Sequence, residues 1–188
     1  MPGCILRIAL GLTLALGASG CVLLGQSDPP VGAGQLEELV NAPGPPLFFA
    51  GPTFAGLPLT HAEREVEGRA LFVYGSCDVE DPDGFFGPEG GSCSPPIQIQ
   101  VFRFNPKDWR PGVVQGCYRR APLRGVATVR HDGLVLFTSN IGVKIYARSP
   151  AEDRRVARSL RALDGTVPPD VDLPSPAFDV ETVLSACS

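Results

Sequence analysis

Two apolar runs joined by a tight turn constrain the fold most strongly. Residues 126–130 and 134–138 are rich in β-branched and aliphatic side chains, and an Asp-Gly pair lies between them at 132–133. Such a pair is typical of a β-hairpin, because glycine adopts a positive φ without strain. After a further turn, residues 141–147 alternate apolar and polar side chains. The pattern predicts a three-stranded antiparallel meander with one buried face.

The segment that follows carries the signals that begin and end a helix. Ser149 occupies the N-cap position, Pro150 the first helical position, and Glu152 completes a capping box. Apolar residues recur at helical spacing on one side, and arginines occupy most of the other side. Gly165 is a typical C-terminal signal. We therefore expect an amphipathic helix over residues 150–164 with a solvated arginine face; contact between those arginines and anionic lipid headgroups is the alternative.

Further strands are expected before the hairpin. Residues 69–75 are rich in aliphatic and aromatic side chains, and residues 97–104 begin with a clear alternation of apolar residues and glutamines. These two runs are expected to pair antiparallel across a long loop, and residues 47–50 are expected to form an edge strand. The predicted fold is α+β: an antiparallel sheet of about five strands with one C-terminal amphipathic helix packed on it.

The charged segment 60–66 admits two interpretations, a short helix or the approach to a strand. In a helix, His61 and Glu65 would lie on one face, as a metal-binding or acid–base pair requires. The competing interpretation is a solvated polar face without chemistry.

The N-terminal segment has the three parts of an export signal. Arg7 precedes the apolar run 8–16, and small residues follow up to Cys21. The sequence Leu-Gly-Ala-Ser-Gly-Cys at 16–21 resembles the lipobox of bacterial lipoproteins. That resemblance implies that residues 1–20 are a signal peptide and that Cys21 becomes the first mature residue, carrying a diacylglyceryl thioether. Two acyl chains would anchor the protein stably to the lipid bilayer.

Two other interpretations of this segment remain open. One is an ordinary secretory signal cut near the same place, which would leave Cys21 as a free or paired thiol. The other is an uncleaved membrane helix, although the apolar run 8–16 is shorter than the roughly 20 residues that a span needs. Residues 21–45, rich in Gly, Pro, Gln and Ser, are expected to be a flexible tether, with one or two helical turns near 35–40. Residues 46–188 are expected to form a single domain.

Four cysteines remain for the folded domain. Cys77, Cys93, Cys117 and Cys187 are an even number in a chain that is expected to be exported, which is typical of two disulfides. Three connectivities are possible, and we favour Cys77–Cys93 with Cys117–Cys187. The first bridge would close a loop of about 15 residues, worth roughly 3 kcal/mol in the chain-entropy model. A metal site is the alternative, but the sequence lacks a Cys-x-x-Cys spacing and has only 2 histidines.

The loop between the first two predicted strands is acidic and rich in Gly and Pro. Its Asp-x-Asp-Gly at 81–84 matches part of a calcium-binding EF-hand loop, but Val79 occupies the first ligand position and no Glu lies at the twelfth. A solvated disulfide loop is the favoured interpretation. Phe85 and Phe86 at its tip either fold back onto the sheet or form an exposed interaction surface.

Composition and motifs narrow the functional classes. The chain has 188 residues and a formal net charge of −4, without a visible basic patch, so nucleic acid is not expected as a partner. The sequence lacks Gly-x-Ser-x-Gly, the P-loop, His-Glu-x-x-His and the dinucleotide fingerprint. No catalytic, cofactor-binding or metal-ligating residue is therefore predicted.

These features together predict a lipid-anchored protein at the extracytoplasmic face of the cell membrane. Its domain is expected to be a non-catalytic binding or interaction module that contacts a small ligand or another protein of the cell envelope. The alternative is a secreted envelope enzyme, such as a hydrolase, whose active site is assembled from distant residues. A structural or assembly factor is the third class.

Overall fold

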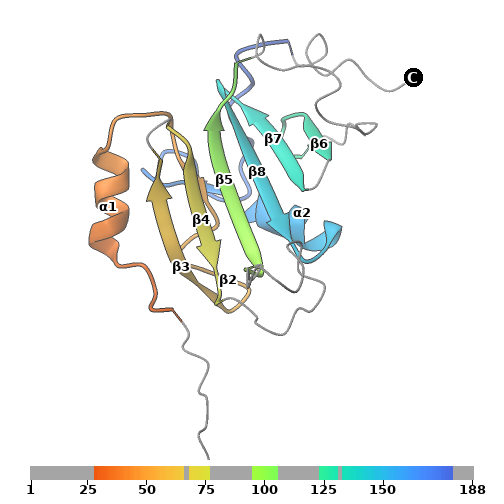
Figure 1. Ribbon diagram of the computed structural model, residues 1–188. Coiled ribbons are helices and arrows are strands. Elements are labelled where there is room, and N and C mark those ends of the chain that lie inside the picture. Colours follow the sequence, from red (N-terminus) through yellow and green to blue (C-terminus); the bar gives the residue numbers. More distant parts are fainter. Residues whose placement is uncertain (1–27, 66–67, 77–94, 106–122, 131–132, 180–188) are drawn as a thin grey trace, which may run out of the picture.

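The computed structural model describes residues 28–65, 68–76, 95–105, 123–130 and 133–179. Within these ranges the chain forms an α+β fold with two helices and antiparallel strands (Figure 1), which confirms the predicted class. The main sheet has seven strands, however, where about five were expected. The helices are α1 (Ala33–Asn41) and α2 (Pro150–Ser159). The strands are β1 (Phe48–Phe49), β2 (Thr53–Phe54), β3 (Leu57–Arg64), β4 (Ala70–Tyr74), β5 (Ile97–Arg103), β6 (Thr128–Arg130), β7 (Leu134–Thr138), β8 (Ile141–Ala147) and β9 (Arg161–Ala162).

The main sheet consists of two meanders joined side by side. Its strand order is β2-β3-β4-β5-β8-β7-β6, with every neighbouring pair antiparallel. The first meander runs from β2 to β5, and the second starts at the far edge with β6 and returns to β8. The seam is the β5–β8 pair, in register from Ile97 opposite Ala147 to Arg103 opposite Ile141. The predicted β4–β5 pair and the predicted three-stranded meander are both confirmed.

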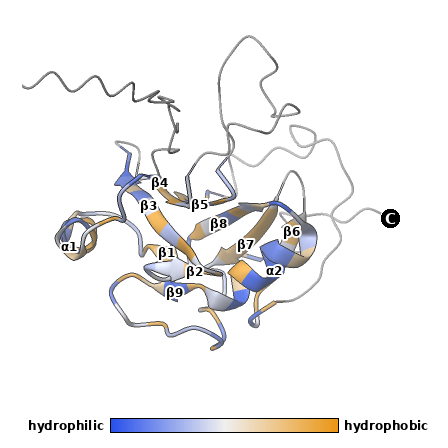
Figure 2. Ribbon diagram, turned by 90° about the horizontal axis from the view of Figure 1, so that it is seen from below, coloured by the Kyte–Doolittle hydropathy of each residue, from blue (hydrophilic) through white to orange (hydrophobic). Residues whose placement is uncertain are grey.

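One face of the sheet, which we call the inner face, carries the main hydrophobic core. Alternate residues of the strands point into it, because successive side chains of a strand lie on opposite faces. In β5, Ile97, Ile99 and Val101 are fully buried, whereas Gln98 and Gln100 between them are only half-buried. Helix α2 and the two-stranded β1–β9 ladder lie against this face (Figure 2). The residues predicted as an edge strand, 47–50, thus contribute to a separate ladder instead of the main sheet.

Tyr74 anchors this ladder from the middle of the core. Its side chain is fully buried, and its hydroxyl accepts a hydrogen bond from the Ala50 amide at 2.8 Å and donates one to the Gly51 carbonyl at 3.0 Å. Burial raises the pKa of the Tyr74 hydroxyl well above its ordinary value, so it stays neutral and keeps its proton for Gly51.

Strands β2 and β3 account for most of the difference in strand count. Segment 60–66 was undecided between helix and strand, and its residues up to Arg64 belong to β3. Charged residues are tolerated there because β3 lies near the edge of the sheet, where His61 and Glu63 are exposed. Strand β2 has only two residues and pairs with the start of β3. Such a short element leaves no periodic signal in a sequence.

Helix α1 covers the edge of β3. The Val31 amide donates to the Leu59 carbonyl at 2.8 Å, and the Gln35 side chain donates to the Ala62 carbonyl at 2.9 Å. Leu39, 8% exposed, enters the main core, and the Arg64 guanidinium donates back to the Leu39 carbonyl. Residues 21–45 were expected to be a flexible tether. In the structure, residues from Val31 onward contact the edge of the sheet instead. Figure 1 shows α1 beside β3.

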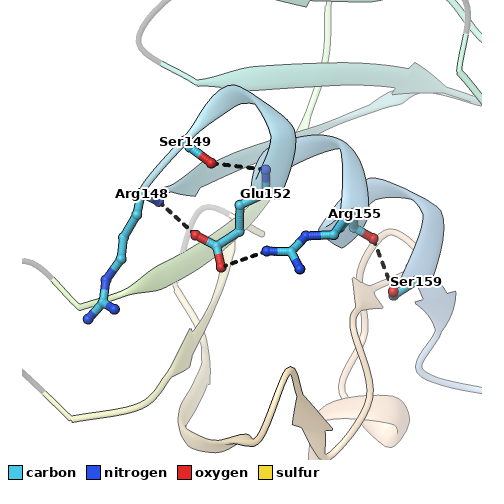
Figure 3. Close-up of polar contacts among 5 residues, drawn as sticks. All are labelled: Arg148, Ser149, Glu152, Arg155 and Ser159. Atoms are coloured by element: carbon cyan, nitrogen blue, oxygen red, sulfur yellow. Dashed lines mark hydrogen bonds and ion pairs between the residues drawn. The ribbon is translucent and has the colours of Figure 1, made fainter.

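Helix α2 begins as predicted and ends early. The Ser149 side chain accepts a hydrogen bond from the Glu152 amide at 3.2 Å, and Glu152 accepts one from the Arg148 amide (Figure 3). The helix ends at Ser159 instead of 164, because Leu160 turns to an extended conformation and Arg161 and Ala162 pair with β1. Asp153, in the first turn of α2, is 2% exposed.

Arg124 fastens the chain beyond α2. Its side chain, which is buried, donates to the backbone carbonyls of four residues at the end of α2 and in the connector after it. These acceptors are Ala157, Leu160, Pro168 and Val171. Burial lowers the pKa of the Arg124 guanidinium, and the nearby charges of Asp170 and Asp172 oppose that shift. The Arg124 side chain thereby joins the connector to the end of the helix, in addition to the backbone hydrogen bond from the Asp170 amide to the Arg158 carbonyl.

A second, smaller aromatic cluster lies on the opposite, outer face of the sheet. It contains Phe104, Val129, Val135 and Phe137, with Phe102 and Phe178 packed against it. The expectation of one buried face is therefore wrong for β7, all of whose residues are buried. The reason is the C-terminal segment. It runs along the end of the sheet, where Ser139 bridges to Pro176, and so places Phe178 against Phe104 with ring centroids 4.7 Å apart.

Candidate functional site

A groove on the outer face, over β4 and β5, is the candidate site. It has a volume of about 390 Å³. The residues that form it belong to β4, to β5 and to the connection between β3 and β4. They are Glu65, Arg69, Ala70, Leu71, Gln100, Val101, Phe102 and Arg103. We call this cavity the outer groove.

Strand pairing fixes the floor of the outer groove. Leu71 and Gln100 are direct cross-strand partners, and both are half-buried on the outer face. Ala70 and Val101 lie directly opposite each other, and their side chains are buried in the main core on the inner face. The backbone below the groove is therefore held by the core, and the side chains of the floor project from two rigid strands.

Phe102 forms the wall between the outer groove and the aromatic cluster. Its cross-strand partner on β8 is Gly142, and a Cβ atom at that position would collide with the Phe102 ring. The absence of a side chain at Gly142 therefore lets the ring lie across β8, where it packs against the aromatic cluster. The aromatic cluster therefore holds the Phe102 ring in place on the side away from the groove.

The charged side chains of the outer groove are those of Arg69 and Glu65. Arg69 Nε lies 2.8 Å from Glu65 Oε2, in an ion pair whose side chains are 58% and 39% exposed. Arg103, at the end of β5, is exposed and lies opposite Ile141, so strand alternation directs its side chain to the side of the inner face, away from Gln100 and Phe102. The Gln100 amide has no side-chain hydrogen bond within the described residues and can serve a ligand.

The rest of the outer face carries polar side chains in rows. Lys144 Nζ lies 4.5 Å from the centroid of the Tyr146 ring, a cation–π contact. On β3, His61 Nε2 lies 3.3 Å from Glu63 Oε2, both about half exposed. The interpretation in which His61 and Glu65 pair on one helical face does not hold, because residues up to Arg64 form β3 and Glu65 pairs with Arg69.

The residues singled out from the sequence lie elsewhere. Cys21, Cys77, Cys93, Cys117, Cys187, Phe85 and Phe86 all fall outside the described residues, so their predicted roles in lipidation, disulfides and interaction stay predictions. Among the residues described, no group of three or more His, Cys, Asp or Glu side chains is placed to hold a metal ion. Neither of the two described helices is long and apolar enough to cross a membrane.

Sequence reasoning missed the outer groove because it depends on a non-local pairing. The alternation of Gln98 and Gln100 marks the outer face of β5. The support of Phe102, however, requires knowing that Gly142 lies opposite, 40 positions along the chain. A glycine inside an apolar strand is the one local signal, since it often marks a close approach.

Comparisons with known proteins identified no relative of this chain. No family model matches the chain, and no match was found among curated proteins or solved structures. The functional argument therefore rests on the sequence and on the outer groove.

Proposed function

We propose that this protein is a lipid-anchored lipoprotein of the extracytoplasmic face of the cell membrane, and that its domain binds a small ligand without catalysing a reaction. The outer groove carries the binding part of the proposal. It combines the half-buried apolar side chains of Leu71 and Phe102 with the Gln100 amide, which has no side-chain hydrogen bond within the described residues, and with the Arg69–Glu65 ion pair. Apolar side chains with a few polar groups on a concave surface are typical of ligand sites.

The anchor rests on the lipobox-like sequence at 16–21. The diacylglyceryl group on Cys21 would supply two acyl chains. Two chains anchor a protein stably to the bilayer, whereas one chain binds only marginally. Only residues 22–30 then separate the anchor from Val31, the first residue that hydrogen-bonds to the sheet. Nine residues span at most about 32 Å, so the domain would stay close to the membrane surface.

Cell fractionation and intact-mass measurement test the anchor. We expect the wild-type protein in the membrane fraction, beginning at Cys21 and carrying the mass of a diacylglyceryl group. Cys21→Ala should accumulate as the uncleaved precursor without that mass. Cys4→Ala, which changes the other N-terminal cysteine, is the matched control and should behave as wild type. Normal processing and lipid mass in Cys21→Ala would overturn the anchor, and with it the proposed location.

A further inference from the structure

Helix α2 turns a face of three arginines to solvent. Arg154, Arg155 and Arg158 are exposed and lie on one side of the helix, because residues three and four apart are neighbours on a helix surface. On the other side, Val156 and Ala157 are fully buried in the main core, so the helix is fixed in this orientation. We call the three arginine side chains the arginine face. We infer that the arginine face docks on a membrane surface that contains anionic phospholipid, as a second contact beside the proposed acyl anchor.

The two carboxylates of α2 do not offset this charge at the surface. Asp153 is buried, and the Glu152 side chain is only 15% exposed. Glu152 Oε1 also lies 3.5 Å from Arg155 Nη2, so its charge is engaged within the helix (Figure 3). Arg154 and Arg158 make no ion pair with the residues that the structure describes. The exposed surface of α2 is therefore cationic, although the whole chain has a formal net charge of −4.

The exposed carboxylates that are closest to α2 in the sequence come after the helix has ended. Asp164 accepts hydrogen bonds from the Thr166 amide and hydroxyl. The Asp170 amide donates to the Arg158 carbonyl, which places Asp170 at the C-terminal end of α2. Arg154, one turn before Arg158, lies farther from that end. We therefore expect the docking contact to centre on Arg154.

Phospholipid headgroups match the arginine face in charge and geometry. A guanidinium presents parallel N–H donors to the oxygens of a phosphate. Near an anionic membrane, each arginine strengthens binding by roughly five-fold, so three together favour the docked state by up to about 100-fold. A preference of this size is too small to hold a free protein at a membrane, but it is large enough to orient a protein that is already anchored there.

The inference rests on the proposed anchor, which keeps the domain within reach of the bilayer. Residues 22–30 span at most about 32 Å and lead to Val31, which hydrogen-bonds to Leu59 of β3. Helix α2 packs on β8 and β7, and three strand spacings, about 14 Å, separate β3 from β8. Residues 22–30 reach farther than this separation, so the anchored domain can lie with the arginine face on the lipid.

Arginine footprinting of the full-length lipidated protein tests the inference. The protein is placed in nanodiscs of phosphatidylcholine, or of equal parts phosphatidylcholine and phosphatidylglycerol, and is treated with phenylglyoxal, which modifies accessible guanidinium groups. Peptide mass spectrometry gives the rate at each arginine. We expect Arg154 and Arg158 to be modified at least about five-fold more slowly in the anionic nanodiscs. High salt should remove this protection, because it screens exposed charges.

Arg69 is the internal control, because it is exposed at the outer groove, on the other side of the sheet from α2. Its rate of modification should be the same in both kinds of nanodisc. Arg154→Gln should remove most of the protection of Arg158, because docking depends on the summed charge of the arginine face. Arg69→Gln is the matched variant and should leave the protection of Arg158 unchanged. Thermal unfolding of each variant checks that the fold is retained.

The outcomes separate the inference from the proposed anchor. Equal rates at Arg154 in the two kinds of nanodisc would overturn the docking and leave the anchor in place. Equal protection of Arg69 and Arg154 would mean that the domain adsorbs without a preferred face, which overturns the inference as well. Protection by soluble glycerophosphoglycerol in phosphatidylcholine nanodiscs would overturn it in favour of a site for free phosphate groups. A protein that co-elutes with neither kind of nanodisc would overturn the anchor, and with it the inference.

Discussion

Tyr74 shows how one side chain joins two parts of the core. Its hydroxyl satisfies both the Ala50 amide and the Gly51 carbonyl, and these backbone groups lead out of the β1–β9 ladder. A buried backbone group without a partner costs about 1–3 kcal/mol. Loss of the Tyr74 hydroxyl is therefore expected to cost more stability than the net contribution of its two hydrogen bonds.

Replacing Tyr74 by Phe should therefore lower the free energy of unfolding by about 2 kcal/mol. The ring would still fill the core, but one donor and one acceptor would lose their partner. Denaturant unfolding measures the change. Tyr146→Phe removes the hydroxyl of a half-buried tyrosine on the outer face, and should change the stability by less than about 0.5 kcal/mol. Equal losses for the two variants would contradict the role assigned to the Tyr74 hydroxyl.

At Gly142 the fold requires the absence of a side chain, because the Phe102 ring occupies the space that a Cβ atom would take. Gly142→Ala would place a Cβ atom against the Phe102 ring at a buried position of β8. We expect a loss of stability of about 1–3 kcal/mol from overpacking. Denaturant unfolding measures the loss. Gly34→Ala, in α1 with open space around it, is the control and should leave the stability unchanged or raise it slightly.

Single residues also show where sequence reasoning stops. The buried position of Arg124 and its four carbonyl partners could not be foreseen, because those partners lie 33 to 47 positions further along the chain. An arginine in a polar segment of a sequence indicates solvent exposure. Only the return of the connector over the end of α2 makes the same residue a buried clamp.

At the scale of elements, local signals identified where α2 begins but not where it ends. Ser149, Pro150 and Glu152 lie within one turn of one another, and their capping contacts need no distant partner. The end of the helix is decided by β1, more than 100 positions earlier, which pairs with Arg161 and Ala162. Long alternating strands such as β5 and β8 were likewise predictable, whereas two-residue strands were not.

The cap of α2 gives a prediction at this scale. Ser149→Ala removes the acceptor for the Glu152 amide and should lower the free energy of unfolding by about 1 kcal/mol. Ser159→Ala is a matched control on the same helix. Its hydroxyl donates to the Arg155 carbonyl at the exposed surface, so its loss should cost less than about 0.5 kcal/mol. A larger loss for Ser159→Ala than for Ser149→Ala, measured by denaturant unfolding, would refute the capping assignment.

At the scale of the whole molecule, strand pairing bears on the predicted disulfides. Tyr74 lies opposite Ile97, and Gly75 approaches Pro96 so closely that a Cβ atom at Gly75 would lie 3.1 Å from Pro96 Cγ. Cys77 comes two positions after Gly75, and Cys93 three positions before Pro96. Gly75 and Pro96 lie side by side, and each is only two or three residues from one of the cysteines. A bond between Cys77 and Cys93 is therefore within the reach of the chain.

Peptide mapping under non-reducing conditions should accordingly find Cys77 linked to Cys93, and Cys117 to Cys187. The second link is favoured by the contact between Phe104 and Phe178, which brings together the chain positions that precede these two cysteines. Mapping after reduction is the control for peptide identity. A link between Cys77 and Cys117 would contradict this connectivity.

The path of the C-terminal segment has a consequence for how the molecule melts. Leu173 belongs to the main core on the inner face, and Phe178, five positions later, belongs to the aromatic cluster on the outer face. The same short stretch is thus a structural component of both cores, and neither can be lost while the other keeps its full complement of side chains. We therefore expect this segment to couple the stability of the two faces of the sheet, so that the domain unfolds as one cooperative unit.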